Sequence, residues 1–138
     1  MNRQTRADEP DHAPIVPREN LDFGLDGDIP KYWMAGDAFK TRFFDAMSTL
    51  FPMGEKFFIT SVREFRDGVT SPKLQQEVKD FIRQEAQHTL IHRQFNDRLK
   101  AQGVDIDAIN QQLETMFFVD VPKVTTRTQR LAATAALE

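Results

Sequence analysis

The sequence predicts an all-α fold. Apolar residues recur at helical spacing from about residue 36 onward, no stretch shows the alternation of a strand, and there is no internal repeat. Twelve Phe against one Trp and one Tyr favour packing between helices. At 138 residues the chain is one domain at most. We expect an extended or disordered arm over residues 1–30 and a helical domain over residues 31–138.

The arm is defined by its prolines and by the absence of helical periodicity. Pro10, Pro14, Pro17 and Pro30 all fall within residues 1–30. Proline fixes one backbone dihedral and removes a hydrogen-bond donor, which disfavours regular structure. Two interpretations remain open for this extended Pro-rich N-terminal arm: it docks across the domain surface, or it is a free tail.

The first two helices are expected on either side of Phe51-Pro52. Asp37 is a candidate N-cap for the first helix. Proline disfavours helix for the residue before it, so we expect a break at this dipeptide. The second helix should then run from Pro52 to Arg66 and end at Asp67-Gly68. The first helix carries a stripe expected to face inward, made of Phe39, Phe43, Ala46, Met47 and Leu50.

The longest helix should begin at Ser71-Pro72, a serine N-cap followed by proline at the first helical position. It is expected to run to about Ala101, roughly 30 residues or about 45 Å. Asp105 opens a shorter amphipathic helix that should end at Val121-Pro122. A last, alanine-rich helix is expected over residues 123–138.

Polar residues interrupt the apolar stripe of the longest helix. Glu85, His88 and His92 lie at positions i, i+3 and i+7 and should point within about 60° of one another. A carboxylate facing a core is costly unless it is paired or binds a metal. Carboxylate oxygens and imidazole nitrogens suit iron, manganese or zinc. The alternative is a solvated face, since the same helix carries many charged residues.

Glu55 is a lone carboxylate in the apolar stretch FPMGEKFF. With Phe58, Ile59 and Val62 it follows the spacing i, i+3, i+4 and i+7, which places it on the apolar face. The alternative is a first-turn glutamate stabilised by the helix dipole. A single Glu on one helix, followed by Glu-x-x-His on the next, is the order of the half-site in four-helix di-metal proteins.

Composition excludes several other classes. A net charge of −3 argues against a general nucleic-acid binder, and the absence of Cys excludes disulfides and thiolate metal sites. The sequence has no stretch typical of a membrane span or a secretory signal, so we expect a cytoplasmic location. No catalytic Ser/His/Asp set, P-loop or dinucleotide-binding glycine motif supports another enzyme class.

Two segments, FPMGEKFFITSVREF (51–65) and VKDFIRQEAQHTLIHRQFN (78–96), resemble the bacterial family of predicted metal-dependent hydrolases, which is related to ferritin-like di-metal carboxylate proteins. The resemblance runs from about Ile15 to the end of the chain. It implies a ferritin-like helical bundle, here partial. The site residues it implies are Glu55, Glu85 and His88 as first-half metal ligands, His92 as a further ligand or close neighbour of the ligands, and Glu138 as a carboxylate of the third helix.

The sequence departs from this family pattern at its end. The pattern continues from the third-helix Glu to a fourth helix with a second Glu/His cluster, which this chain does not reach. We expect a form truncated after its first half; a naturally short member is the alternative. If Leu137-Glu138 derives from a cloning vector, Glu138 is not a ligand.

The resemblance implies a hydrolase that activates water at a di-metal carboxylate/histidine site and acts on an unknown small-molecule substrate. The expected cofactors are divalent metal ions, iron first, with manganese and zinc as alternatives. Two other functions remain open: a di-iron oxygenase or oxidase, and a non-enzymatic helical dimerisation fragment without metal. A half-bundle with a Phe-rich inner face should associate, so we expect a homodimer in which two Glu55, Glu85 and His88 sets can meet.

Overall fold

The computed structural model describes residues 13–138, so the first part of the predicted arm lies outside the described residues. The described chain is helical and contains no strand, which confirms the all-α prediction. None of its helices is both long and apolar enough to cross a membrane. The elements are α1 (Ala38–Arg63), the 3₁₀ turn η1 (Arg66–Gly68), α2 (Pro72–Ala101), α3 (Ile106–Thr115), the π-helical turn η2 (Met116–Asp120), α4 (Val121–Val124) and α5 (Arg127–Leu137).

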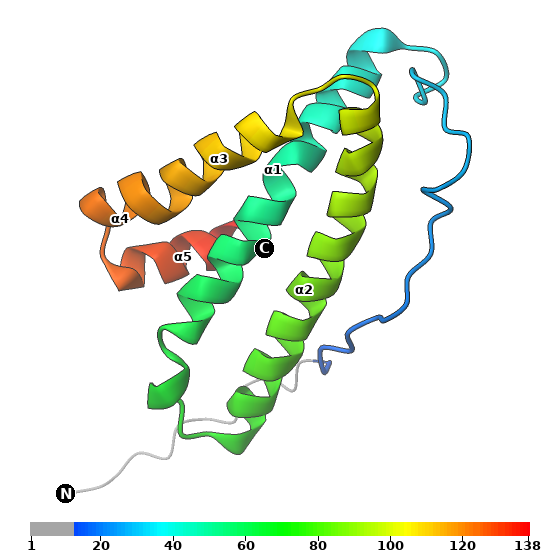
Figure 1. Ribbon diagram of the computed structural model, residues 1–138. Coiled ribbons are helices and arrows are strands. Elements are labelled where there is room, and N and C mark those ends of the chain that lie inside the picture. Colours follow the sequence, from blue (N-terminus) through cyan, green and yellow to red (C-terminus); the bar gives the residue numbers. More distant parts are fainter. Residues whose placement is uncertain (1–12) are drawn as a thin grey trace, which may run out of the picture.

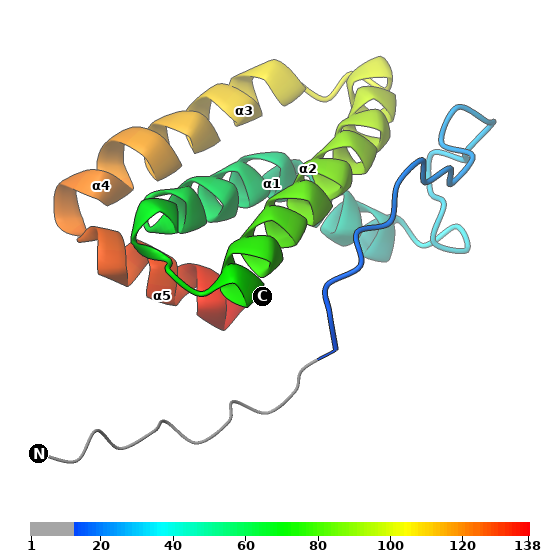
Figure 2. The ribbon, with the colours of Figure 1, turned by 90° about the horizontal axis from the view of Figure 1, so that it is seen from below.

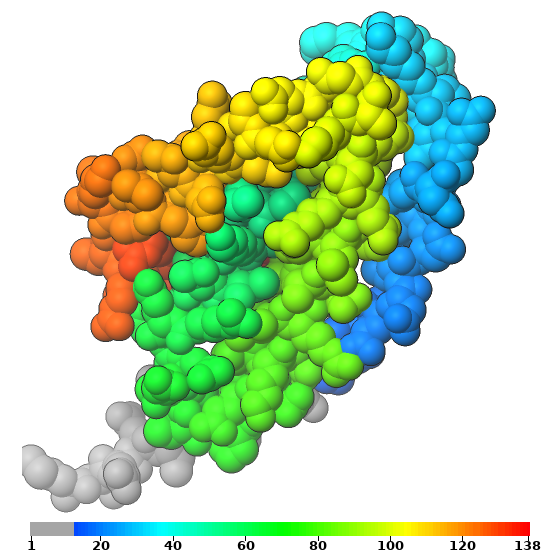
Figure 3. Space-filling model, in the orientation of Figure 1, coloured from blue at the N-terminus to red at the C-terminus, as the bar shows by residue number. Residues whose placement is uncertain are grey.

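Helices α1 and α2 form an antiparallel pair, and α1 is the central element (Figure 1). Seen from below, α3 and α5 lie on opposite sides of α1 (Figure 2). The N-terminal segment, residues 13–37, is not helical and runs along the outer side of α2 (Figure 3). The division of the chain into an arm and a domain at residue 30 stays a prediction.

Polar caps fix the starts of the helices. Asp37 accepts the backbone N–H of Lys40 at the start of α1, as expected. Ser71 accepts the N–H of Leu74 at the start of α2, and Asp105 caps α3 in the same way. These side chains satisfy backbone donors that have no partner within the helix. The predicted extent of α2 is confirmed.

The predicted break at Pro52 is wrong, because α1 continues through it. Proline has no N–H, so the carbonyl of Ser48 loses its partner within the helix. The side chain of Asn96 on α2 replaces that donor: its Nδ2 lies 3.0 Å from the Ser48 carbonyl oxygen. Asn96 is only 2% exposed. A hydrogen bond between helices therefore allows a proline inside α1.

Two other helix boundaries differ from the prediction. Val121-Pro122 does not end the helical path, since η2 leads into α4 and proline is tolerated in the first turn of α4. The last helix begins at Arg127 rather than at Lys123, because Thr126 and Gln129 cap each other's backbone N–H groups. Helix α1 ends three residues before the predicted Arg66, and η1 follows.

The buried face of α1 is polar, contrary to the predicted inward stripe. Phe39 is 80% exposed and Phe43 is 53% exposed, whereas Thr41 and Asp45 are buried. The reason is a set of donors that converge on Asp45 from Trp33, Arg42 and Arg98. These partners satisfy the carboxylate against α2, and the apolar stripe is left on the outer side of α1.

We predict that Asn96→Ala lowers the free energy of unfolding by about 1–3 kcal/mol, because it leaves the buried Ser48 carbonyl without a donor. In a Pro52→Ala background the cost should be smaller, since the introduced alanine restores a backbone N–H to the same carbonyl. Urea unfolding of the wild type, both single variants and the double variant measures this coupling. If Asn96→Ala lowered the free energy of unfolding equally in both backgrounds, Asn96 would not be replacing the backbone donor that Pro52 lacks.

Candidate metal centre

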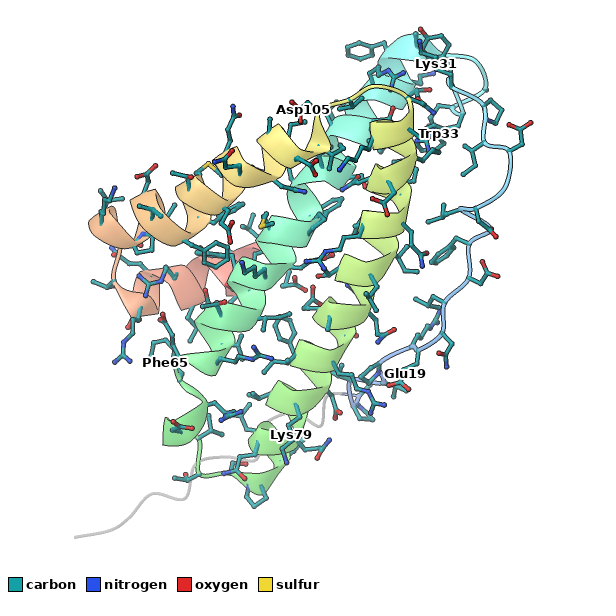
Figure 4. The ribbon with its side chains drawn as sticks, in the orientation of Figure 1. Glu19, Lys31, Trp33, Phe65, Lys79 and Asp105 are labelled. Atoms are coloured by element: carbon teal, nitrogen blue, oxygen red, sulfur yellow. The ribbon has the colours of Figure 1, made fainter. Side chains whose placement is uncertain are left out.

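Three of the predicted ligands meet at the middle of the α1–α2 interface. Glu55 comes from α1, and Glu85 and His88 come from one face of α2. Each offers one potential ligand atom, and these atoms lie within 4.8 Å of one another. Figure 4 shows polar side chains in the space between the two helices. The antiparallel pairing of α1 and α2 thus brings together residues 30 or more positions apart in the sequence.

Glu85 is the more deeply buried of the two carboxylates in this cluster. It is 2% exposed, and its Oε1 atom accepts no hydrogen bond from the described residues. The Nδ1 of His88 lies 3.5 Å from that oxygen. A buried carboxylate oxygen without a partner is expensive. A divalent cation would satisfy it, and two carboxylates with one imidazole are a suitable donor set.

Glu55 has one strong polar contact. The Oγ1 of Thr89 lies 2.7 Å from its Oε2 and 3.0 Å from the backbone oxygen of Glu85. The pKa of Glu55 is raised to about 7: burial is the main cause, the charges of Glu85 and Glu138 contribute, and the Thr89 hydrogen bond opposes the rise. Metal binding would therefore release a proton from this carboxyl group at neutral pH.

His92 is a neighbour of the cluster and lies outside the 4.8 Å set. Its Nε2 is 3.7 Å from Glu55 Oε1, and its Nδ1 is 3.2 Å from Ser48 Oγ. Burial lowers the pKa of His92, and His88 lowers it further, so the ring is neutral at neutral pH. Both roles implied by the family resemblance, further ligand or close neighbour, remain predictions.

Glu138 follows the end of α5 and also lies outside the 4.8 Å set. Burial raises the pKa of its carboxyl group, and the charge of Glu85 raises it further. Glu138 in turn contributes to the raised pKa of Glu55. The end of α5 therefore places a third carboxylate near enough to the cluster to affect its pKa values. The role of Glu138 as a ligand stays a prediction.

Sequence reasoning missed two hydroxyl groups that hold the site residues. Thr89 contacts Glu55, and Ser48 contacts His92. A positional signal existed for both. Thr89 is four residues after Glu85 on α2, and Ser48 is seven residues before Glu55 on α1, so each lies near the face that carries a candidate ligand.

The raised pKa of Glu55 predicts a pH-dependent stability for the metal-free protein. The folded state binds more protons than the unfolded state between the ordinary pKa of 4.5 and the folded value of about 7. The free energy of unfolding should therefore fall as pH rises through this window. Glu55→Gln removes the titrating group, so its stability relative to the wild type should increase over the same range.

Denaturant unfolding in EDTA from about pH 4.5 to about pH 8 measures this difference. Asp28→Asn, at an exposed position of the N-terminal segment, is the matched control and should follow the wild type. If the free energy of unfolding changed with pH in parallel for the wild type and Glu55→Gln, the raised pKa of Glu55 would be contradicted.

Comparison with known proteins identifies the family. Residues 17–138 match the family model described as predicted metal-dependent hydrolase. No curated protein and no solved structure was found to match the chain. The resemblance inferred from residues 51–65 and 78–96 is confirmed at the level of the family. Because the match covers most of the sequence, the chain belongs to the family of predicted metal-dependent hydrolases.

Proposed function

We propose that Glu55, Glu85 and His88 bind a divalent metal ion and that the bound site hydrolyses a small molecule. The observation that carries this proposal is the buried Glu85 oxygen without a hydrogen-bond donor, beside a second buried carboxylate and an imidazole. A carboxylate of this kind is poorly suited to a purely structural role, because its Oε1 accepts no hydrogen bond from the described residues and the imidazole 3.5 Å away, His88, is itself a candidate ligand. Membership of a metal-dependent family supports the same interpretation.

The chemistry assigned to the metal is activation of water. A divalent ion held by Glu55, Glu85 and His88 would lower the pKa of a water molecule and so supply a nucleophile at neutral pH. Among the chain's own residues, Glu55 and Glu85 provide negative charge and Thr89 orients Glu55. His92 is neutral, is positioned by Ser48 and lies beside Glu55, so it is suited to accept a proton from an attacking water.

Iron is the first expectation for the metal, with manganese and zinc as alternatives, because all three accept carboxylate and imidazole ligands. The ferritin-like di-metal arrangement is part of the proposal: a second ion would draw on His92, Glu138 and further donors. The same residues would suit a di-iron oxygenase or oxidase. Metal identity separates these functions, since zinc supports hydrolysis and excludes redox chemistry at the metal.

We also propose that the chain forms a homodimer through the exposed stripe of α1. The accessible surface of the chain is 10312 Å², whereas a compact monomer of this mass exposes about 7,350 Å². Part of the difference belongs to the extended N-terminal segment. The remainder includes Phe39, Phe43 and Leu50, large apolar side chains that monomers rarely expose together.

The position of this stripe limits what the dimer does. Phe39, Phe43 and Leu50 lie about 120–160° around α1 from Glu55. A partner on the stripe therefore covers apolar surface and leaves the two metal clusters apart. We assign the dimer a stabilising role and place the metal chemistry within each chain.

We predict that Glu85→Gln with His88→Ala removes tightly bound metal and keeps helicity, because the variant loses two of the three donors. Metal content by mass spectrometry after purification, with far-ultraviolet circular dichroism beside it, measures both effects. Glu114→Gln removes an exposed carboxylate and should keep the wild-type metal content. Unchanged stoichiometry in the double variant would reject the ligand assignment, and a metal-free wild type would favour the non-enzymatic dimerisation fragment.

We predict that Phe43→Glu shifts the solution mass from about twice the 15.9 kDa of one chain to a single chain. A charge at the centre of the stripe would have to be buried in the dimer. Light scattering after size exclusion gives the mass. Leu90→Glu, at an exposed apolar position on α2, is the control and should stay dimeric. A dimer that withstands Phe43→Glu would place the interface elsewhere.

A further inference from the structure

Two cavities adjoin the candidate metal centre beneath the N-terminal segment. The first, of about 470 Å³, lies between this segment and α2, and His88 and His92 line it. The second, of about 520 Å³, is walled by aromatic side chains, among them Trp33, Phe44 and Phe95. Phe23, Ile91 and His92 line both cavities. The two cavities therefore adjoin at these three residues, and the first of them also reaches His88.

The first cavity carries the charge of this space, and the second is almost entirely apolar. Arg18 is the one residue with a permanent charge among those lining either cavity. It forms no ion pair with the described residues, whereas the neighbouring Glu19 pairs with Arg83 on α2. Figure 4 labels Glu19 beside α2, where the segment crosses the helix. An unpaired guanidinium beside an apolar groove offers complementarity to an anion with an apolar body.

We propose that this joined space binds an apolar molecule that carries a single carboxylate. The carboxylate pairs with Arg18, the apolar part packs against Trp33, Phe44 and Phe95, and the middle of the molecule passes His88 and His92. The single guanidinium of Arg18 matches the one charge of a carboxylate better than the double charge of a phosphate monoester. That this molecule is the substrate rests on the proposed hydrolase function; that it binds does not.

The groove differs from the dimer stripe in ways that favour a small molecule as its occupant. Phe23 and Leu25 of the N-terminal segment form part of its wall, so chain already covers it. Phe39, Phe43 and Leu50 of the α1 stripe line neither cavity, whereas Met47 of the same stripe lines the second one. Volumes of this size are typical of ligand cavities. Aromatic walls with one charged group at the end are a common arrangement for amphiphilic ligands.

The test uses the fluorescence of Trp33, the single tryptophan of the chain, which lies in the groove. Decanoate, titrated below its micelle concentration, should give a saturable change. The neutral 1-decanol should bind roughly tenfold more weakly, since it lacks the charge-assisted pair. Absence of saturable binding, or equal affinity for the two ligands, would overturn the proposal.

Variants locate the binding. Arg18→Gln should remove the preference for decanoate over decanol, whereas Lys79→Gln, an equal charge change at an exposed position outside both cavities, should keep it. Ile91→Glu, where the cavities join, should weaken both ligands. The proposal would be overturned if Arg18→Gln kept the preference for decanoate over decanol. It would also be overturned if a folded Ile91→Glu variant bound both ligands with wild-type affinity. A dimer that decanoate dissociates would overturn it as well, because a second copy would then occupy the groove.

Failure of this inference is distinguishable from failure of the proposed function. Glu85→Gln should lose metal affinity and still bind decanoate, because Glu85 does not line either cavity. Decanoate binding in a wild type that takes up no metal would reject the hydrolase and keep the ligand site. Metal binding without Arg18-dependent ligand binding would reject the ligand site alone.

Discussion

The burial of charged groups between α1 and α2 is the constraint on which the rest of the structure depends. This interface places Asp45, Glu55 and Glu85 at 2–4% exposure, in positions where other bundles place leucine. Each carboxylate must find a cation or a donor there. With this face of α1 taken up by polar side chains, Phe39, Phe43 and Leu50 lie on its exposed side.

The two ends of the interface meet this requirement differently. Near the start of α1, Asp45 accepts hydrogen bonds from Trp33, Arg42 and Arg98, so that end is satisfied by the chain itself. At the centre, Glu55 receives the Thr89 hydroxyl, while Glu85 Oε1 receives nothing from the described residues. This contrast between a carboxylate satisfied by the chain and one without a hydrogen-bond donor is the reason why we propose the metal site at the centre.

Caps and helical spacing are local signals, and they predicted the helical class and the limits of α2. The joint role of Glu55, Glu85 and His88 was implied by the family resemblance, since spacing alone left other interpretations open. The sequence did not predict the continuity of α1. Pro52 is tolerated through Asn96, a residue 44 positions away, and no local pattern encodes that contact. The outward direction of the Phe39 stripe was missed for the same reason, since amphipathicity indicates two faces and only the partners of Asp45 decide which face is buried.

The most direct test of the account is a crystal structure of the protein grown with Mn²⁺ and recorded with anomalous scattering. We predict an anomalous peak between α1 and α2, with carboxylate oxygens of Glu55 and Glu85 and a ring nitrogen of His88 at about 2.0–2.3 Å, as is usual for first-row metals. A structure without that peak, in which Glu85 Oε1 pairs with a donor from the protein, would contradict the central claim.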